Sequence, residues 1–158
     1  MNTIYIITLG KLKESYWREA EAEYIKRLGP LAKIVIHELK EESFSDKDLP
    51  DAIKQKEAEK INFVLKKFPG AHVVALDEHG EHYTSVQFSK KLEQFNNTNN
   101  LTIFILGGPL GLHRSLRARA RETFSLSPLT FTHQMARVIL LEQIYRGMMI
   151  LANRKYHY

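Results

Sequence analysis

Strand-like and helix-like segments alternate along most of this chain, and this alternation constrains its fold more than any other feature. Short apolar runs at residues 71–76 and 102–106 have the length and composition of strands that are buried in a sheet. Segments such as 15–28 and 51–68 place apolar residues at helical spacing. The alternation predicts one α/β domain with a mainly parallel sheet, flanked by helices and joined by right-handed crossovers.

The strand predicted at 102–106 stops at a glycine-rich loop, Gly107-Gly108-Pro109-Leu110-Gly111. Glycine permits tight turns and lets a ligand approach the backbone without a Cβ in the way. In open α/β sheets ligands bind at the carboxyl ends of strands, so this loop is a candidate binding site. A tight turn without a ligand is the alternative that the loop alone leaves open.

Composition excludes several kinds of site. The chain has 158 residues and no cysteine, which excludes disulfides, thiolate nucleophiles and cysteine-based zinc sites. No stretch approaches the roughly 20 apolar residues of a membrane helix, and the N-terminus does not resemble a signal peptide, so a cytoplasmic protein without a membrane partner is expected. His79 and His82 have a metal-like spacing, but they lie in an expected polar turn without a third ligand, so we expect no metal.

The net charge of +5 is unevenly distributed. Residues 1–112 hold 15 Lys and Arg against 16 Asp and Glu, whereas residues 113–158 hold 8 against 2. A short helix expected at about 112–121 would present a basic stripe of Arg114, Arg117 and Arg121. Arginine suits phosphate groups, so the stripe favours a polyanionic partner, with a solvated basic face as the alternative.

The last predicted helix, at about 134–152, is apolar on every side. Such a helix must be covered on every side, which the sheet of so small a chain cannot do alone, so we expect a two-fold homodimer. Arg137 lies on an apolar stripe of this helix, where an unpaired charge is costly, and is therefore a functional candidate. Glu142 and Arg146 have the spacing of a structural ion pair.

Several motifs occur together. The glycine loop is followed by a Ser-Leu-Ser-Pro-Leu-Thr-Phe segment at 125–131, by His133-Gln134-Met135-Ala136-Arg137-Val138, and by the tail Asn153-Arg154-Lys155-Tyr156-His157. Together with the segments 9–13 and 23–28, they resemble the RlmH family of SPOUT (α/β-knot) methyltransferases over the whole chain. One departure is Thr132, where that family often has proline.

The resemblance implies a single SPOUT domain over residues 1–158, with a C-terminal trefoil knot and a cofactor-binding knot region at about 71–158. It implies a cytoplasmic homodimer that transfers a methyl group from S-adenosylmethionine to 23S ribosomal RNA. The acceptor would be N3 of a pseudouridine in the helix 69 loop, within the assembled ribosome. Two alternatives stay open: a SPOUT methyltransferase for another rRNA or tRNA site, and a non-catalytic ribosome-binding factor.

The resemblance also implies the site residues. The cofactor contacts would come from Leu76, Gly107, Leu126, Ser127, Pro128, Leu129, Thr130 and Phe131, and the backbone at Gly108 and Gly111 could add to them. The catalytic candidates are His133, Arg137, Tyr156 and His157. A neutral His133 could accept the N3 proton, and Arg137 could stabilise negative charge on the base. Tyr156 and His157 could position the base or contact RNA.

Overall fold

The structure is a computed structural model that describes residues 2–98 and 101–156. Its centre is one five-stranded sheet in the order β2-β1-β4-β3-β5, and every strand pair is parallel. The predicted α/β fold is therefore confirmed. The strands are β1 (Thr3–Leu9), β2 (Lys33–Leu39), β3 (His72–His82), β4 (Leu101–Leu106) and β5 (Glu122–Ser125).

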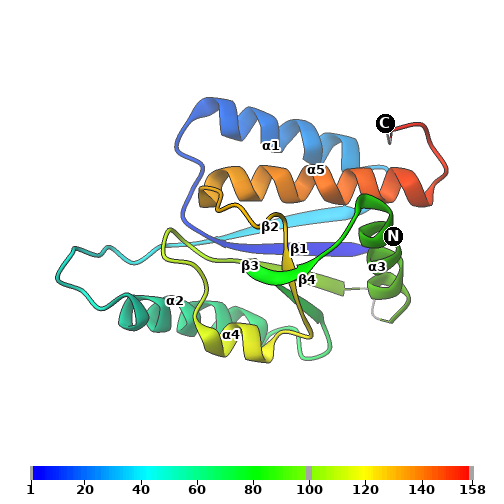
Figure 1. The fold of residues 1–158 in the computed structure, drawn as a ribbon. Coiled ribbons are helices and arrows are strands. Elements are labelled where there is room, and N and C mark those ends of the chain that lie inside the picture. Colours follow the sequence, from blue (N-terminus) through cyan, green and yellow to red (C-terminus); the bar gives the residue numbers. More distant parts are fainter. Residues whose placement is uncertain (1, 99–100, 157–158) are drawn as a thin grey trace.

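Helices cover both faces of the sheet (Figure 1). One layer contains α1 (Ser15–Leu28), α3 (Ser85–Thr98) and α5 (His133–Leu151), with α5 packed against both of the others. The opposite layer contains α2 (Pro50–Leu65) and the short α4 (Arg114–Arg119), which contact each other. No helix of the described residues is long and apolar enough to cross a membrane.

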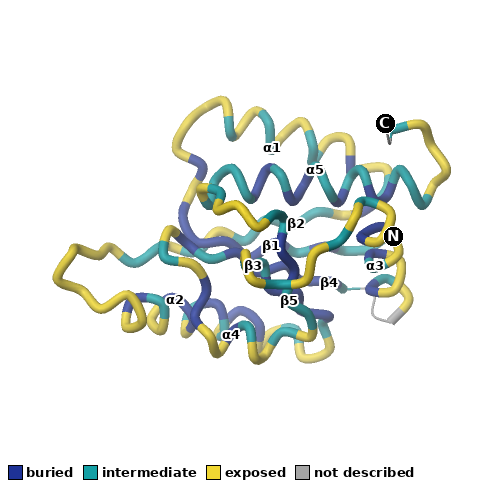
Figure 2. The backbone as a smooth tube through the Cα atoms, in the orientation of Figure 1, coloured by how far each residue is buried: buried dark blue, intermediate teal, exposed yellow. Residues whose placement is uncertain are grey.

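The core has two parts because successive strand residues point to opposite faces of the sheet. On β1, Ile4 and Ile6 pack with residues of α1, α3 and α5, whereas Ile7 and Leu9 pack with residues of α2 and α4. Strands β1 and β4 and the first half of β3 are buried, β2 is partly buried, and the outer sides of α1 and α2 are exposed (Figure 2). The continuous apolar runs in the sequence thus mark strands that are covered on both faces.

The middle of the chain differs from the sequence prediction in two ways. The segment 79–82 is the second half of β3 and not a polar turn, because Glu81 and His82 pair with β5 after an irregularity that follows Leu76. The sequence Thr84-Ser85-Val86-Gln87 has the pattern of a capping box, which is confirmed with N–H to side-chain oxygen distances of 2.9 and 3.2 Å. The helix that it opens continues to Thr98, three residues into the polar segment 96–100 that the sequence predicts as a loop.

The segment after the glycine loop is also arranged differently. The helix predicted at about 112–121 forms only over Arg114–Arg119. The next strand is Glu122–Ser125, so the segment 125–131, which the sequence predicts as a short strand or an extended loop, gives only Ser125 to a strand and is a loop from residue 126. Strand pairing explains the shift, since β3 offers partners to residues 122–125 and none to the segment interrupted by Pro128.

Candidate functional site

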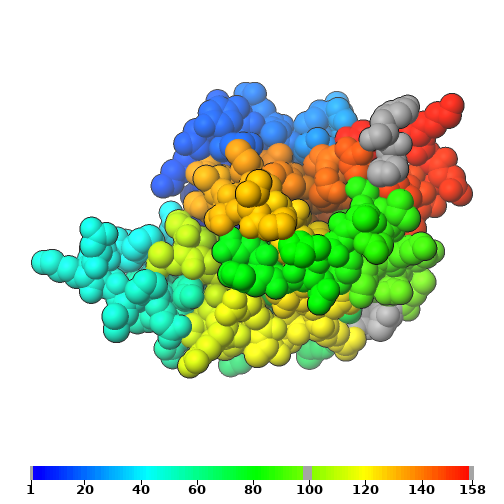
Figure 3. Space-filling view, in the orientation of Figure 1, coloured from blue at the N-terminus to red at the C-terminus, as the bar shows by residue number. Residues whose placement is uncertain are grey.

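A hollow with a volume of about 770 Å³ lies at the carboxyl end of β4, beside the irregularity that follows Leu76 in β3. Three stretches line it: residues 76–79 from β3, residues 106–112 with the glycine loop, and residues of the segment 126–136 that leads into α5. These segments lie side by side on the face seen in Figure 3. The cavity therefore occupies the edge of the sheet where open α/β folds bind ligands.

The glycine loop is folded tightly onto itself. A Cβ on Gly107 would lie 2.5 Å from the carbonyl carbon of Gly111, closer than any side chain tolerates. Gly111 has a φ of +84°, in the left-handed region, and its N–H donates to the Gly108 carbonyl at 3.0 Å. Two of these glycines are thus required by the turn itself, and the turn forms one wall of the cavity.

Most of the predicted cofactor residues meet at this cavity. Nine of the ten line it, and only Pro128 does not. The apolar part of the wall comes from Leu76, Leu106 and Leu126, side chains that lie far apart in sequence. The side chain of Leu129 also lines the cavity although most of its surface is exposed, so this part of the site is open to solvent.

The structure adds polar groups to the site. Residues 77–80 leave the regular pairing of β3 with β5, and Asp77 accepts hydrogen bonds from the N–H of His79 at 2.9 Å and from Arg117 at 3.0 Å. Burial opposes ionisation of Asp77, but the hydrogen bonds from His79 and the charge of Arg117 outweigh it and lower the pKa of this carboxyl. Lys54 of α2 also lines the cavity.

Sequence patterns could not have shown the role of Arg117. The stripe prediction placed it with Arg114 and Arg121 on an outer helix face, and for Arg117 this is wrong. Its guanidinium turns toward Asp77, a residue 40 positions earlier in the chain. Lys54 likewise has no local signal, since only the packing of α2 below the glycine loop brings it to the cavity.

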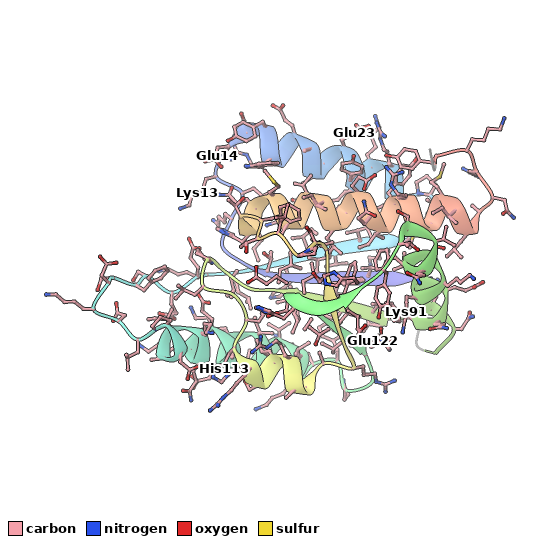
Figure 4. All side chains as sticks on the ribbon, viewed as in Figure 1. Lys13, Glu14, Glu23, Lys91, His113 and Glu122 are labelled. Carbon is pink, nitrogen blue, oxygen red and sulfur yellow. The ribbon has the colours of Figure 1, made fainter. Side chains whose placement is uncertain are left out.

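His133 lies at the start of α5, on the rim of the cavity. Its Nε2 is buried and has no hydrogen-bond partner among the described residues. Burial lowers the pKa of His133, and the charges of Lys13 and Arg137 lower it further, against the opposing charge of Glu41. Lys13, labelled in Figure 4, is close because its N–H donates to Gln134 at 3.0 Å. His133 is therefore neutral at pH 7 and able to accept a proton.

Arg137 lies one helical turn after His133 but does not line the cavity. Its side chain is only 3% exposed and forms a two-fold hydrogen-bonded ion pair with Glu21 of α1. Its third contact is Glu38 of β2, at 2.7 Å. In this chain the guanidinium therefore ties α5 to α1 and β2. The Glu142–Arg146 pair predicted as structural is confirmed, at 2.7 Å.

The catalytic candidate Tyr156 lies at the other end of α5. Tyr156 packs edge-on against Tyr145, with 4.7 Å between ring centroids, and under Arg146. Twelve helical residues separate Tyr145 from His133, which is roughly 18 Å along the helix axis at 1.5 Å per residue. Tyr156 and His133 of one chain therefore do not meet. His157 lies outside the described residues.

The described residues contain no group of three or more His, Asp or Glu that could hold a metal ion. His79, one of the two histidines with metal-like spacing, is bonded to Asp77 through Nδ1 at 3.1 Å.

Comparisons with known proteins agree on the family. Residues 2–157 match the model of a family described as predicted SPOUT methyltransferase. The chain is 44% identical to the ribosomal RNA large subunit methyltransferase H of Pseudothermotoga lettingae, over 98% of this chain and 99% of that protein.

Solved structures support the fold. A tRNA (m1G37) methyltransferase from Aquifex aeolicus superposes with a TM-score of 0.56 and 12% identity, over 92% of this chain and 70% of that one. The SpoU methyltransferase AviRb from Streptomyces viridochromogenes, solved in complex with AdoMet, gives a TM-score of 0.50 and 11% identity over 98% and 60% of the two chains. At such identities the likeness concerns the fold alone.

Proposed function

Because this chain belongs to the RlmH family of SPOUT methyltransferases, we propose that it methylates ribosomal RNA, with S-adenosylmethionine as the methyl donor. We extend this to N3 of a pseudouridine in the helix 69 loop of 23S rRNA within the assembled ribosome. The observation that carries the proposal is the meeting of the glycine loop, the 126–131 segment and a neutral His133 at one cavity.

The cavity suits the proposed cofactor in size and chemistry. Sites for small molecules usually measure about 300–1,000 Å³ and are mostly apolar with a few placed polar groups. Leu76, Leu106 and Leu126 supply apolar wall, and Asp77 is an ionised acceptor for hydroxyl or ammonium groups. When bound, the cofactor supplies a sulfonium methyl that is already reactive. The residues of the chain have to align the acceptor with that methyl and remove one proton.

We assign the proton acceptor to His133. Its neutral ring lines the cavity. Its Nε2 is buried and has no partner among the described residues, so in this proposal binding of the base has to expose Nε2 before it accepts the imide proton. The ring is set by the start of α5, where Thr132 Oγ1 accepts the N–H of Met135 at 3.4 Å. Thr132 thus caps the first turn of α5 through its hydroxyl, which a proline at this position could not do.

Arg137 acts in this proposal through His133. Its bonds to Glu21 and Glu38 fix the first turns of α5, and its charge lowers the pKa of His133. We therefore assign it a positioning role in this chain. A merely structural residue would change stability only, whereas loss of the Arg137 charge would also move the pH dependence of methyl transfer.

A homodimer would complete the site. Tyr156 is remote from His133 in the same chain, so Tyr156 can serve the cavity only if a second copy brings it there. Support comes from apolar residues of α5 that stay half-exposed, Met135, Ile139, Met149 and Ile150, and from Tyr16 of α1, which is 60% exposed. A two-fold axis beside α5 would cover them.

The fold assignment also leads us to propose a trefoil knot and a cytoplasmic location. After β5 at the sheet edge, the chain passes the cavity as the 126–132 loop and then crosses to the opposite layer as α5. This path beside the glycine loop is the part of residues 71–158 where the chain would thread. Cleavage and re-ligation, or single-molecule unfolding, would test the knot.

Methyl transfer from radiolabelled S-adenosylmethionine to ribosomes that lack the modification tests the function. We expect transfer to intact ribosomes and a single modified nucleotide, identified by mass mapping. The His133→Gln variant should bind the cofactor but transfer far more slowly. Methylation of tRNA or of a different rRNA nucleotide would replace the target, and ribosome binding without cofactor binding would favour a non-catalytic factor.

A further inference from the structure

The α2/α4 layer is the most basic part of the molecule. Residues 50–67 and 113–121 together contain nine Lys and Arg but only three Asp and Glu, a net charge of +6. Because the whole chain carries +5, the rest of it has a net charge of −1. By contrast, α1 on the opposite layer has three basic and three acidic residues within Ser15–Leu28. The asymmetry is thus a property of one layer.

The two basic segments form one continuous surface. His113, labelled in Figure 4, lies 3.5 Å from Asp51 at the start of α2. Arg119 bonds to Asn62, which lies 11 residues later in α2. Two contacts of this kind show that α4 runs beside α2 in the same direction. Their exposed side chains therefore form one face, here called the basic α2/α4 face, whose basic members are Lys56, Lys66, Lys67, Arg114, Arg119 and Arg121.

Much of this charge has no internal partner. Lys56, Lys66, Arg114 and Arg121 are exposed and form no ion pair with any residue that the structure describes. Two other cations of the layer form ion pairs within the chain: Lys60 pairs with Glu42 at 2.7 Å, and Arg117 pairs with Asp77. The exposed cations are available to an external polyanion.

An aromatic side chain lies among these cations. Phe63 of α2 is 65% exposed, and the ammonium of Lys67 lies 5.2 Å from its ring centroid. A large exposed ring within a cationic surface is a feature of proteins that bind the backbone and stack on bases or sugars of single-stranded nucleic acid. A face that served solubility alone would gain nothing from Phe63.

The basic α2/α4 face adjoins the cavity through α4. This helix, which carries Arg114 and Arg119 of the face, begins three residues after Gly111 of the glycine loop, and Lys54 on the inner side of α2 lines the cavity. An RNA strand bound along α2 and α4 would therefore place its target base next to the cavity that His133 lines. From the opposite layer, α5 lines the cavity with His133, Gln134 and Ala136 and with no cation, and the charge of nearby Arg137 is already paired.

We propose that the basic α2/α4 face is the surface on which the RNA substrate docks. Its lysines and arginines bind backbone phosphates that flank the target nucleotide, and Phe63 stacks on a neighbouring unpaired nucleotide. This inference rests on the proposed function for the identity of the substrate but adds the route by which it approaches. Arg114 and Arg121, which face outward, contribute affinity, whereas Arg117 belongs to the cavity.

Charge reversal tests the proposal. The variants Lys56→Glu/Lys66→Glu and Arg114→Glu/Arg121→Glu change exposed side chains without internal partners, so they should fold. The control is Lys26→Glu/Lys90→Glu, which makes the same charge change on α1 and α3, where both lysines are exposed. The probe is a synthetic RNA hairpin with the helix 69 sequence, and its Kd is measured at several salt concentrations together with the Kd for S-adenosylmethionine.

We expect either test variant to bind the hairpin about 10- to 100-fold more weakly, with the slope of log K against log salt reduced by about 2. The control should bind much like the unchanged protein, and cofactor affinity should stay constant throughout. Phe63→Ala should weaken hairpin binding by about 5- to 100-fold, the range of one lost stacking contact, with no change in the salt slope.

Three outcomes would overturn the proposal. Unchanged hairpin binding by both test variants would exclude the basic α2/α4 face as the RNA-binding surface. Equal weakening by the control variant would show that binding depends on the net charge of the protein and not on this face. If the test variants lose ribosome binding but still bind the hairpin, the face binds a ribosomal protein and not the RNA substrate. Failure of the proposed function looks different: the unchanged protein would then bind the hairpin by this face and yet methylate no ribosome.

Discussion

The two helical layers each bury one charged side chain, and they satisfy it differently. In the α1/α3/α5 layer, Arg137 is held by Glu21 and Glu38. In the α2/α4 layer, Glu57 is just as buried, at 3% exposed, but accepts a single hydrogen bond, from the N–H of Glu42 at 3.1 Å. Burial raises the pKa of Glu57, against the hydrogen bond from Glu42 and the charge of Lys60, and the carboxylates of Glu41 and Glu42 add to the rise. One charge is locked between three elements, and the other is one whose ionisation the fold disfavours.

The difference shows which layer has to stay fixed. The locked arginine lies one turn from His133, so the layer that positions the proposed proton acceptor is also the one with the strongest buried ion pair. The α2/α4 layer carries its surplus positive charge outward, where an RNA partner can use it. We infer that one layer supports the chemistry and the other supports docking, and the tests below examine that division.

The largest expected effect is the loss of the locked charge. Arg137→Ala would leave Glu21 and Glu38 without their partner, and removal of one member of a buried pair typically costs about 3–5 kcal/mol. Urea unfolding followed by circular dichroism measures this. Adding Glu21→Gln to the same variant should restore part of the loss, because one stranded carboxylate disappears. If Arg137→Ala lowers the free energy of unfolding by less than about 1 kcal/mol, the ion pairs of Arg137 with Glu21 and Glu38 do not stabilise the fold as proposed.

The glycine loop, which lies over Glu57, allows a matched pair of substitutions. In Gly107→Ala the new Cβ would lie 2.5 Å from backbone atoms of Gly111, whereas in Gly108→Ala its nearest neighbour is Glu57 Oε1 at 3.5 Å. Overpacking against backbone costs about 1–3 kcal/mol. We therefore expect Gly107→Ala to weaken S-adenosylmethionine binding about 10- to 100-fold by calorimetry, and Gly108→Ala to change it little. Equal effects would show that the tight turn does not shape the cavity.

The third test links the locked charge to the chemistry through pH. Burial lowers the pKa of His133 below its ordinary value of 6.5, so the neutral, proton-accepting form persists at pH 6.5 and is lost only on further acidification. Single-turnover methyl transfer should accordingly have its acidic limb below pH 6.5. Arg137→Gln removes a positive charge that lowers this pKa, so the limb should move to higher pH. If the acidic limb of the pH profile does not move in a folded Arg137→Gln protein, Arg137 contributes to stability only and does not tune His133.

The smallest effect concerns Glu57. A carboxyl whose pKa is raised on folding destabilises the native state at neutral pH, and this cost disappears as acidification protonates it. Glu57→Gln keeps the hydrogen-bond acceptor without the charge. It should stabilise the protein at pH 7 by less than about 1 kcal/mol, and the gain should shrink as the pH falls toward 4.5. Thermal melts across this pH range would measure it, and destabilisation at pH 7 would mean that the charge is needed.

Several parts of the site could be predicted from the sequence because their signals are local. The capping box at Thr84 lies within four residues, and so does the Glu142–Arg146 pair. The glycine run was recognisable because only glycine fits a turn as tight as the one at Gly107 and Gly111. The segment 126–131 was identified by resemblance, since its loop conformation has no periodicity to detect.

Other parts could not be predicted because they depend on partners far along the chain. Arg137 was recognised as an expensive charge, but nothing in the spacing pointed to Glu21, 116 residues away, as its partner. Arg117 fitted an outer stripe by its helical position, yet Asp77 draws it to the cavity. The strand β5 begins at Glu122, earlier than the sequence predicts, because β3 offers pairing partners to residues 122–125.

The sequence by itself determined the elements, their alternation and hence the α/β class, because hydrophobic periodicity, caps and glycine turns act over a few residues. It also determined that positive charge is concentrated after the glycine loop. Only the tertiary structure decided that lysines of α2 join that charge, that His133 reaches the cavity in neutral form, and that Arg137 is locked. These properties depend on burial and on pairing between distant segments, and neither exists until the chain has folded.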